Sequence, residues 1–167
     1  MKKIIRSLLL PASVVLASCV GSTQQQEEGF NYIDERFADI QMLRYNVEGF
    51  DALSLQQKTF VYYLQEAALW GRDILFDQNG RYNLEIRRMM EKLYQEYDGD
   101  RECADFKAFE IYLKRLWFSN GIHHHYGSEK FSPEFSREWF VAQTSCPDEI
   151  AEVIFNPEVM PKRVNQA

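Results

Sequence analysis

Three consecutive histidines, His123, His124 and His125, lie between two glycines in the stretch W-F-S-N-G-I-H-H-H-Y-G-S-E-K-F, which spans residues 117–131. They are the only histidines of the 167-residue chain, so any imidazole chemistry must take place here. Imidazole nitrogens can coordinate a metal ion, contact a substrate, or hydrogen-bond a turn. The stretch therefore indicates a metal site, a substrate-facing loop, or histidines that hydrogen-bond a turn and pack against Tyr126.

A metal site needs more ligands than the histidines supply. In an extended segment, His123 and His125 would point to one side and His124 to the other, and an H-x-H pair in a strand can chelate zinc. A third protein ligand is still required, and spacing assigns no Asp or Glu to that role. The chain also contains no C-x-x-C pair. These residues alone disfavour metal binding and leave the packed turn and the substrate-facing loop open.

Amphipathic helices are the elements that must position this stretch. Ser54-Leu55-Gln56-Gln57 is a capping box and predicts a helix that begins there and ends near Asn79-Gly80. The small members of its apolar face should let a second helix approach closely. That face is formed by Phe60, Leu64, Ala67, Gly71 and Ile74.

Two further helices are expected between residue 80 and the histidines. Apolar residues recur at helical spacing in each, and the second helix should end at Asn120-Gly121 in a left-handed C-cap. Ser132-Pro133 and Cys146-Pro147 resemble two more helix starts. Phe37–Val47 alternates partly and predicts a strand or a short irregular helix. The expected fold is mainly α with a minor β part. The apolar stripe of the first of the two helices before the histidines is Ile86, Met90, Leu93 and Tyr97, and that of the second is Phe106, Phe109, Leu113, Leu116 and Trp117.

The N-terminus has the pattern of a bacterial lipoprotein export signal. A basic start and a short apolar run lead to L-A-S-C, which resembles a lipobox, so we expect a signal peptide over 1–18 and a lipid on Cys19. The apolar run is too short to span a bilayer of ~30 Å. Residues 19–32 read as a polar tether. The protein is thus expected to be exported and lipid-anchored to the cell envelope, on the periplasmic or surface face of a membrane.

The charge balance argues against a nucleic-acid partner. Removal of the signal would leave 16 basic against 25 acidic residues, a net charge of about −9. Phosphate binding needs clustered Lys and Arg, which the chain lacks. The spacing of Cys103 and Cys146 permits a disulfide but does not require one.

Four separated segments resemble the N-terminal part of dipeptidyl peptidase III, in the versions found in Bacteroides-type bacteria. The resemblance runs from Phe37 to Phe140 and covers most of the mature chain, whose expected domain is residues 33–167. The strongest resemblance places Asn120 at a helix end, Tyr126-Gly127 in the loop, and Lys130-Phe131 before Pro133. The segments are R-Y-N-V-E-G-F-D-A-L-S-L-Q-Q-K, Y-Y-L-Q-E-A-A-L-W-G-R-D-I, D-Q-N-G-R-Y-N-L-E-I-R and Y-L-K-R-L-W-F-S-N-G-I-H-H-H-Y-G-S-E-K-F-S-P.

The resemblance implies a zinc exopeptidase that releases dipeptides from the N-terminus of oligopeptides. Family members have two lobes, and this chain would form the helical N-terminal portion of the lower lobe. The family's zinc motifs, H-E-x-x-G-H and E-E-x-x-A, are missing here, so zinc would belong to the full-length protein and this chain would bind none. We therefore expect a portion cut short at its C-terminus that is inactive alone.

On this interpretation the histidines are not zinc ligands. Asn120, His123, His125 and Tyr126 become candidates for contact with an oligopeptide in the cleft, and no residue of the chain is catalytic. The alternative is a non-catalytic, membrane-anchored lipoprotein that binds a peptide or protein partner through surfaces around its tryptophans, Trp70, Trp117 and Trp139.

Overall fold

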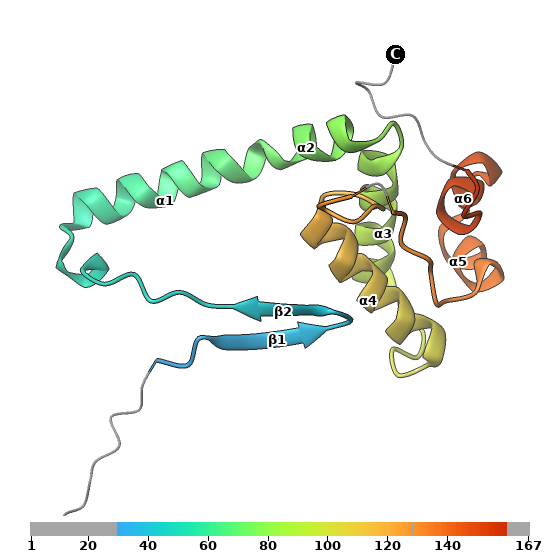
Figure 1. Ribbon diagram of the computed structural model, residues 1–167, viewed down its shortest axis with the longest axis horizontal. Helices are drawn as coiled ribbons and strands as arrows, with labels where there is room; N and C mark the ends of the chain where they lie inside the picture. Colours follow the sequence, from blue (N-terminus) through green and yellow to red (C-terminus); the bar gives the residue numbers. More distant parts are fainter. Residues whose placement is uncertain (1–29, 128, 160–167) are drawn as a thin grey trace, which may run out of the picture. The chain divides into compact units, whose positions relative to one another are not determined.

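The computed structural model describes residues 30–127 and 129–159, and these form a mainly helical fold with a small antiparallel hairpin (Figure 1). The expected fold class, mainly α with a minor β part, is confirmed. The proposed signal peptide, Cys19 and most of the tether lie outside the described residues. The elements are β1 (Ile33–Phe37), β2 (Ile40–Leu43), the 3-10 turn η1 (Phe50–Ala52), α1 (Leu55–Trp70), α2 (Arg72–Asn79), α3 (Asn83–Glu96), α4 (Ala104–Ser119), α5 (Arg137–Thr144) and α6 (Asp148–Phe155).

Of the strand or short irregular helix expected over Phe37–Val47, the structure has the strand, β2, which is the second half of a hairpin. β1 pairs with β2, and Phe37 lies opposite Ile40 across a turn in which Ala38 has a φ of 49°. The reversal at this turn was missed because neither residue of Ala38-Asp39 is a glycine or asparagine, the usual signals of a tight hairpin.

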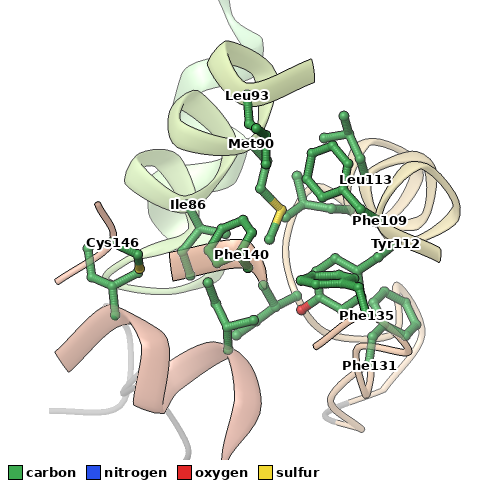
Figure 2. Close-up of a cluster of buried hydrophobic side chains, with 14 of the residues drawn as sticks. Ile86, Met90, Leu93, Phe109, Tyr112, Leu113, Phe131, Phe135, Phe140 and Cys146 are labelled. Carbon is green, nitrogen blue, oxygen red and sulfur yellow. The ribbon is translucent and has the colours of Figure 1, made fainter. Parts of the chain in front are cut away.

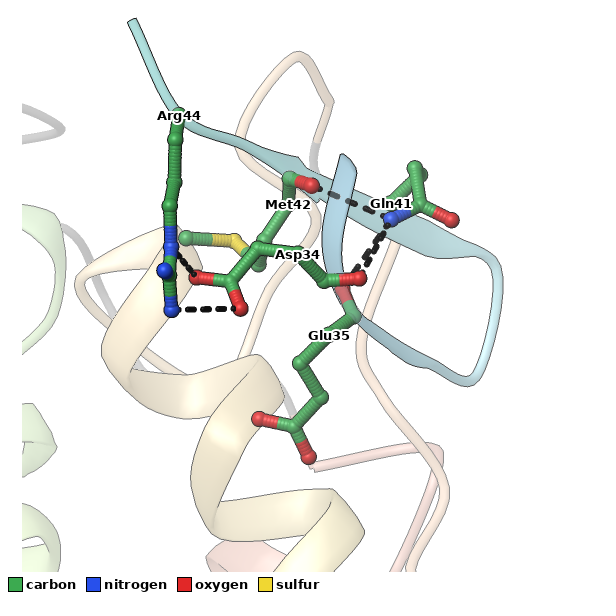
Figure 3. Close-up of polar contacts among 5 residues, drawn as sticks. All are labelled: Asp34, Glu35, Gln41, Met42 and Arg44. Carbon is green, nitrogen blue, oxygen red and sulfur yellow. Dashed lines mark hydrogen bonds and ion pairs between the residues drawn. The ribbon is translucent and has the colours of Figure 1, made fainter. Parts of the chain in front are cut away.

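Polar contacts hold the hairpin together and tie it to α4. The Nε and Nη2 of Arg44 donate to the two carboxylate oxygens of Asp34, at 2.8 and 3.0 Å (Figure 3). The Nζ of Lys114 lies 2.6 Å from a carboxylate oxygen of Glu35, and Arg115 pairs with the carboxylate of the hairpin turn. A two-stranded hairpin is marginal by itself in water, so these contacts with α4 help to hold it.

Helix α1 begins as the capping box predicts. The Ser54 hydroxyl accepts from the Gln57 amide at 3.3 Å, and the Gln57 side chain accepts from the Ser54 amide at 2.9 Å. The single helix expected to reach Asn79 is broken at Gly71, whose amide donates to Ala68 and Leu69 carbonyls in a tightened turn. Helix α2 continues after this break.

The apolar face of α1 does not pack against a second helix, contrary to the expectation. Phe60 is 64% exposed and Leu64 is 53% exposed, and α1 contains no buried residue. In α2 only Phe76 is buried, while Ile74 stays 59% exposed. This expectation is wrong because α1 is apolar on several sides rather than on one face. In addition, α3, α4, α5 and α6 bury their apolar residues against one another in a core that does not include α1.

The core lies between α3, α4 and the two C-terminal helices (Figure 2). The stripes expected on α3 and α4 are confirmed except at their last residues, and Tyr97, which directly follows α3, is only partly buried. Trp117, at the end of the second stripe, is only partly buried, and its indole nitrogen donates to Glu91 at 2.8 Å. The buried residues of these two stripes are Ile86, Met90, Leu93, Phe106, Phe109, Leu113 and Leu116.

One of the two expected proline-marked helix starts is confirmed. Helix α6 begins at Asp148, directly after Cys146-Pro147. Ser132-Pro133 starts no helix, because α5 begins only at Arg137, where the Ser136 hydroxyl caps it by accepting from the third amide along. The real cap residue lies four positions beyond the serine that the proline rule selected.

Candidate functional site

The histidines lie in a tight hairpin-like loop between α4 and α5. Backbone bonds join its two legs, with the Phe131 amide donating to Ile122 at 2.9 Å and the His124 amide donating to Glu129 at 2.8 Å. At the tip, the Gly127 amide donates to the His124 carbonyl at 3.1 Å. The loop from Ile122 to Phe131 is called the histidine loop below.

The three histidines have three different environments. His123 is buried at 6% exposure and pairs across the loop with Lys130, whereas His124 is half-buried and His125 is exposed. The Nδ1 of His124 accepts from the Tyr126 amide at 3.2 Å, so its neutral form carries the proton on Nε2. The ring of His124 thus hydrogen-bonds the turn of the loop.

Aromatic rings form a ladder along the exposed side of the loop. The His124 and His125 rings stack with centroids 4.4 Å apart, and the His125 ring lies 4.2 Å from that of Tyr126. Phe118, on the last turn of α4, meets His125 edge-on at 4.9 Å. Tyr126 is 90% exposed, so the ladder ends in a side chain open to a partner.

The extended H-x-H geometry is wrong, because the chain turns at His124 instead of continuing as a strand. Pairing of His123 with Lys130 leaves too few residues for two extended legs, and His124 to Gly127 must close the turn. Within residues 30–127 and 129–159, no group of three His, Cys, Asp or Glu side chains could hold a metal ion.

Two asparagines at the corner between α2 and α3 attach to the start of the histidine loop. The Nδ2 of Asn79 donates to the Asn120 carbonyl at 3.2 Å, and the Oδ1 of Asn83 accepts from the Ile122 amide at 3.4 Å. A Cβ added at Gly121 would lie 2.4 Å from the Asn83 side-chain nitrogen, so glycine is needed for this close approach. Segments about 40 residues apart thus meet at one place.

Asn120 adopts the left-handed conformation expected of it, with φ 53° and ψ 40°, and its amide closes α4 on the Leu116 carbonyl. It is half-buried, with its carbonyl engaged by Asn79. Asn120 therefore has a structural role at the helix end. Of the four candidates for peptide contact, His125 and Tyr126 are the exposed ones, whereas Asn120 and His123 lie deeper.

A cavity of about 210 Å³ opens beneath the histidine loop. Its lining comes from the corner between α2 and α3 on one side and from the end of α4 and the histidine loop on the other. Sequence reasoning missed Asn79, Asn83 and Ser119 as members of this site. A signal existed, because Asn83 is a polar residue at the start of the apolar stripe of α3, three positions before Ile86. The lining residues are Asn79, Asn83, Ser119, Gly121, His123, His124, His125, Tyr126 and Gly127.

Lys130 and Phe131 anchor the second leg of the loop. The Nζ of Lys130 donates to the carbonyls of Val153 at 2.7 Å and Val159 at 3.3 Å, and also to that of Asn156. Burial lowers the pKa of Lys130, with Glu152 opposing this. Phe131 is 8% exposed, with the Arg115 guanidinium 5.1 Å from its ring centre. The Lys-Phe pair is therefore structural, joining the loop to the end of α6.

The two cysteines of the described residues are free thiols in separate environments. Cys103 precedes α4, where its Sγ accepts from the Phe106 amide at 3.4 Å. Cys146 is buried at 6% exposure, and burial raises the pKa of its thiol to about 11. No disulfide joins them.

Comparison of the chain with models of protein families finds no match, and a search of curated proteins finds none either. In the described ranges, no helix has both the length and the apolar character needed to cross a membrane.

Proposed function

We propose that this chain is the helical N-terminal portion of the lower lobe of a dipeptidyl peptidase III-like zinc exopeptidase, in which the histidine loop contacts the oligopeptide substrate. The proposal rests on the resemblance of the sequence segments quoted above. In the complete enzyme, zinc would activate a water molecule for attack on the scissile carbonyl. The ligands of that metal would come from other residues of the complete protein, and this chain would supply part of the cleft wall.

The observation that carries the proposal is the meeting of two resembling segments at one cavity. Residues 77–87 contribute the asparagine corner, and residues 112–133 contribute the end of α4 and the histidine loop. Loops held by rigid helices commonly carry binding residues, and this one is held at both legs. The pocket is lined by asparagine, serine and histidine residues beside the exposed ring of Tyr126, and such groups can hydrogen-bond the backbone of an extended peptide.

The exposure of α1 supports a larger fold. A helix that is apolar on all sides is ordinarily buried within a protein, yet α1 exposes large apolar side chains on every turn. Trp70, at its end, is 85% exposed. In the proposed enzyme, other parts of the lobe would cover this helix. The exposed apolar residues of α1 are Leu55, Phe60, Val61, Tyr62, Tyr63, Leu64, Leu69 and Trp70.

The same exposure favours the alternative, a membrane-anchored lipoprotein that binds a partner without chemistry. Of the three tryptophans on which that alternative drew, Trp117 and Trp139 are partly buried against the core, and only Trp70 is widely exposed. A binding surface would therefore have to centre on α1.

Reading the gene downstream of the codon for Ala167 tests the enzyme class. We expect an in-frame H-E-x-x-G-H helix motif, and a short non-homologous continuation without any zinc motif would defeat the proposal. The protein encoded by the whole gene then tests the loop. Tyr126→Ala should raise the KM for dipeptide release from an oligopeptide, whereas Tyr45→Ala, at a tyrosine that is 83% exposed outside the loop, should not.

A further inference from the structure

A second cavity lies between the hairpin, the start of α2 and the end of α4, and we call it the hairpin pocket. Its volume is about 420 Å³, against about 210 Å³ for the cavity beneath the histidine loop. Ligand pockets in proteins commonly measure roughly 300–1,000 Å³. The hairpin pocket is therefore large enough to take a whole side chain from a partner.

The apolar part of the lining consists mostly of aromatic residues that solvent can reach. Phe37 and Trp117 are half-buried, whereas Met42 and Phe118 are 37% and 40% exposed. Aromatic rings attract one another in offset and edge-on arrangements, and a thioether also contacts an aromatic ring favourably. The lining thus favours an aromatic occupant over an alkyl chain.

Two of these rings are held in place by contacts outside the pocket. The indole nitrogen of Trp117 donates to Glu91 at 2.8 Å, and the ring of Tyr94 meets that of Trp117 edge-on with centroids 6.1 Å apart. The ring of Phe118 meets that of His125 edge-on at 4.9 Å. Side chains that are already ordered lose less conformational entropy when a ligand binds. The two rings therefore offer a preformed surface.

Of the four charged residues that line the pocket, three are already paired with other side chains. Asp34 forms two hydrogen bonds with Arg44, and Glu35 pairs with Lys114 at 2.6 Å. Arg72, the first residue of α2, is exposed and forms no hydrogen bond or ion pair with the part of the chain that the structure describes. A guanidinium group presents donors in a fork that matches the two oxygens of a carboxylate. The free charge at this pocket is thus positive and suits a carboxylate.

We propose that the hairpin pocket binds the C-terminal residue of a peptide that ends in an aromatic side chain, with the ring against Trp117 and Phe118 and the carboxylate paired with Arg72. A C-terminal residue suits this pocket because it carries the charge and the side chain on one carbon atom. Phe118 also belongs to the aromatic ladder of the histidine loop, so the two sites adjoin. This inference rests on the proposed function, and the pocket would hold the end of the oligopeptide opposite to the one that is cleaved.

The test is a titration of the purified full-length chain, isotope-labelled at its methionine methyl groups, with peptides of one length. N-acetyl-alanyl-alanyl-phenylalanine should shift the Met42 resonance saturably. Met89, which lines a different cavity between α3 and α5, and Met90, which is fully buried, should not move. The C-terminal amide of this peptide should bind about fivefold more weakly, as expected for the loss of one exposed charge pair. N-acetyl-trialanine, which has no ring, should bind at least roughly tenfold more weakly.

Substitutions separate the contact with Arg72 from a general loss of positive charge. Arg72→Gln should lower the affinity for the acid to that for the amide, and it should leave the affinity for the amide unchanged. Arg36→Gln is the matched control, because Arg36 is also exposed and lies on β1 outside the pocket lining, so this variant should bind the acid as the unchanged chain does. Phe118→Ala should weaken the acid and the amide by the same factor, since it removes a ring and leaves the charge.

A shorter acid tests whether the occupant is the end of a peptide. N-acetylphenylalanine carries the same ring and carboxylate without a preceding chain, so the tripeptide should bind at least as tightly. If the tripeptide bound several times more weakly, the pocket would exclude a continuing chain and take a free aromatic acid, and the proposal would be overturned.

The proposal also fails if Met42 does not move with any probe, if Met89 moves as much as Met42, or if Arg72→Gln leaves the difference between acid and amide unchanged. None of these measurements involves catalysis, so this inference and the proposed function fail separately. A whole gene without a zinc motif would remove the enzyme and leave a positive titration standing. An unmoved Met42 would remove the peptide pocket without bearing on the enzyme class.

Discussion

Lys130 is expected to contribute more to stability than any other lysine in the described residues, because its charged end caps a helix inside the fold. Its Nζ donates to the carbonyls of Val153, Asn156 and Val159 at the end of α6. Of these three residues, only Val153 belongs to α6; Asn156 directly follows the helix, and its carbonyl also accepts from the Val159 amide at 3.2 Å. A cation at a helix C-terminus interacts favourably with the carbonyls of the last turn and with the aligned peptide dipoles. Lys130→Met keeps the length of the side chain and removes the charge and the donors.

The expected magnitude follows from opposing effects. A partly buried cation at a helix C-terminus contributes up to ~2 kcal/mol, and a buried carbonyl left unpaired costs about 1–3 kcal/mol. Burial of the ammonium group opposes this gain, as the lowered pKa of Lys130 shows. Methionine adds apolar burial, which offsets part of the loss. We therefore expect Lys130→Met to lower the free energy of unfolding by about 2 kcal/mol.

Urea unfolding followed by far-UV circular dichroism measures this change. With a slope of ~2 kcal/mol per molar urea, the midpoint should fall by about 1 M. Lys92→Met is the matched control, because Lys92 is 73% exposed and makes only a 3.9 Å contact with Glu96, so its midpoint should hardly move. Equal midpoints for the two variants would refute the capping role.

Three further predictions test burial and anchoring. Leu113→Ala, in the core, should cost about 2–5 kcal/mol, whereas Leu64→Ala on α1 should change the free energy of unfolding by less than about 0.5 kcal/mol; a large loss at the second site would mean that α1 is packed. With the other cysteines replaced by serine, Cys146 in the folded chain should stay unreactive toward a thiol reagent until the pH nears 11. The thiol of the unfolded chain ionises first, at a pKa of ~8.5, so the contribution of Cys146 to the free energy of unfolding should be lost as the pH rises from ~8.5 to about 11. Reaction of the folded chain at pH 8 at the rate of the unfolded chain would contradict this. Cys19→Ala should move the protein from the membrane fraction to the soluble fraction, and continued membrane association would require another anchor.

Several local features of this fold could be predicted from the sequence, because each depends on residues within one or two helical turns. The capping box at Ser54 is satisfied by Gln57, three residues away. Asn120 closes α4 in the left-handed conformation that asparagine tolerates better than most residues. The stripes of α3 and α4 were identifiable because helical periodicity places them on one face, whatever that face contacts.

The histidine loop shows where such local reasoning fails. Spacing alone offered an extended H-x-H pair, but hydrogen bonds between Ile122 and Phe131 close the loop and bury His123 while His125 remains exposed. The cavity depends on Asn83, which lies 39 residues before the Ile122 amide that it contacts. A polar residue on an apolar stripe marked the position without showing its partner.

The sequence by itself determined the helical periodicity, the caps and the residues capable of chemistry, and it carries the resemblance on which the proposed function rests. Only the tertiary structure decided that α1 leaves its apolar faces exposed, that the hairpin is tied to α4, and that an asparagine corner meets the histidine loop. The physical reason is the range of the interactions. Caps and periodic faces are set by neighbours along the chain, whereas burial, cavities and unpaired groups depend on which distant segments pack together.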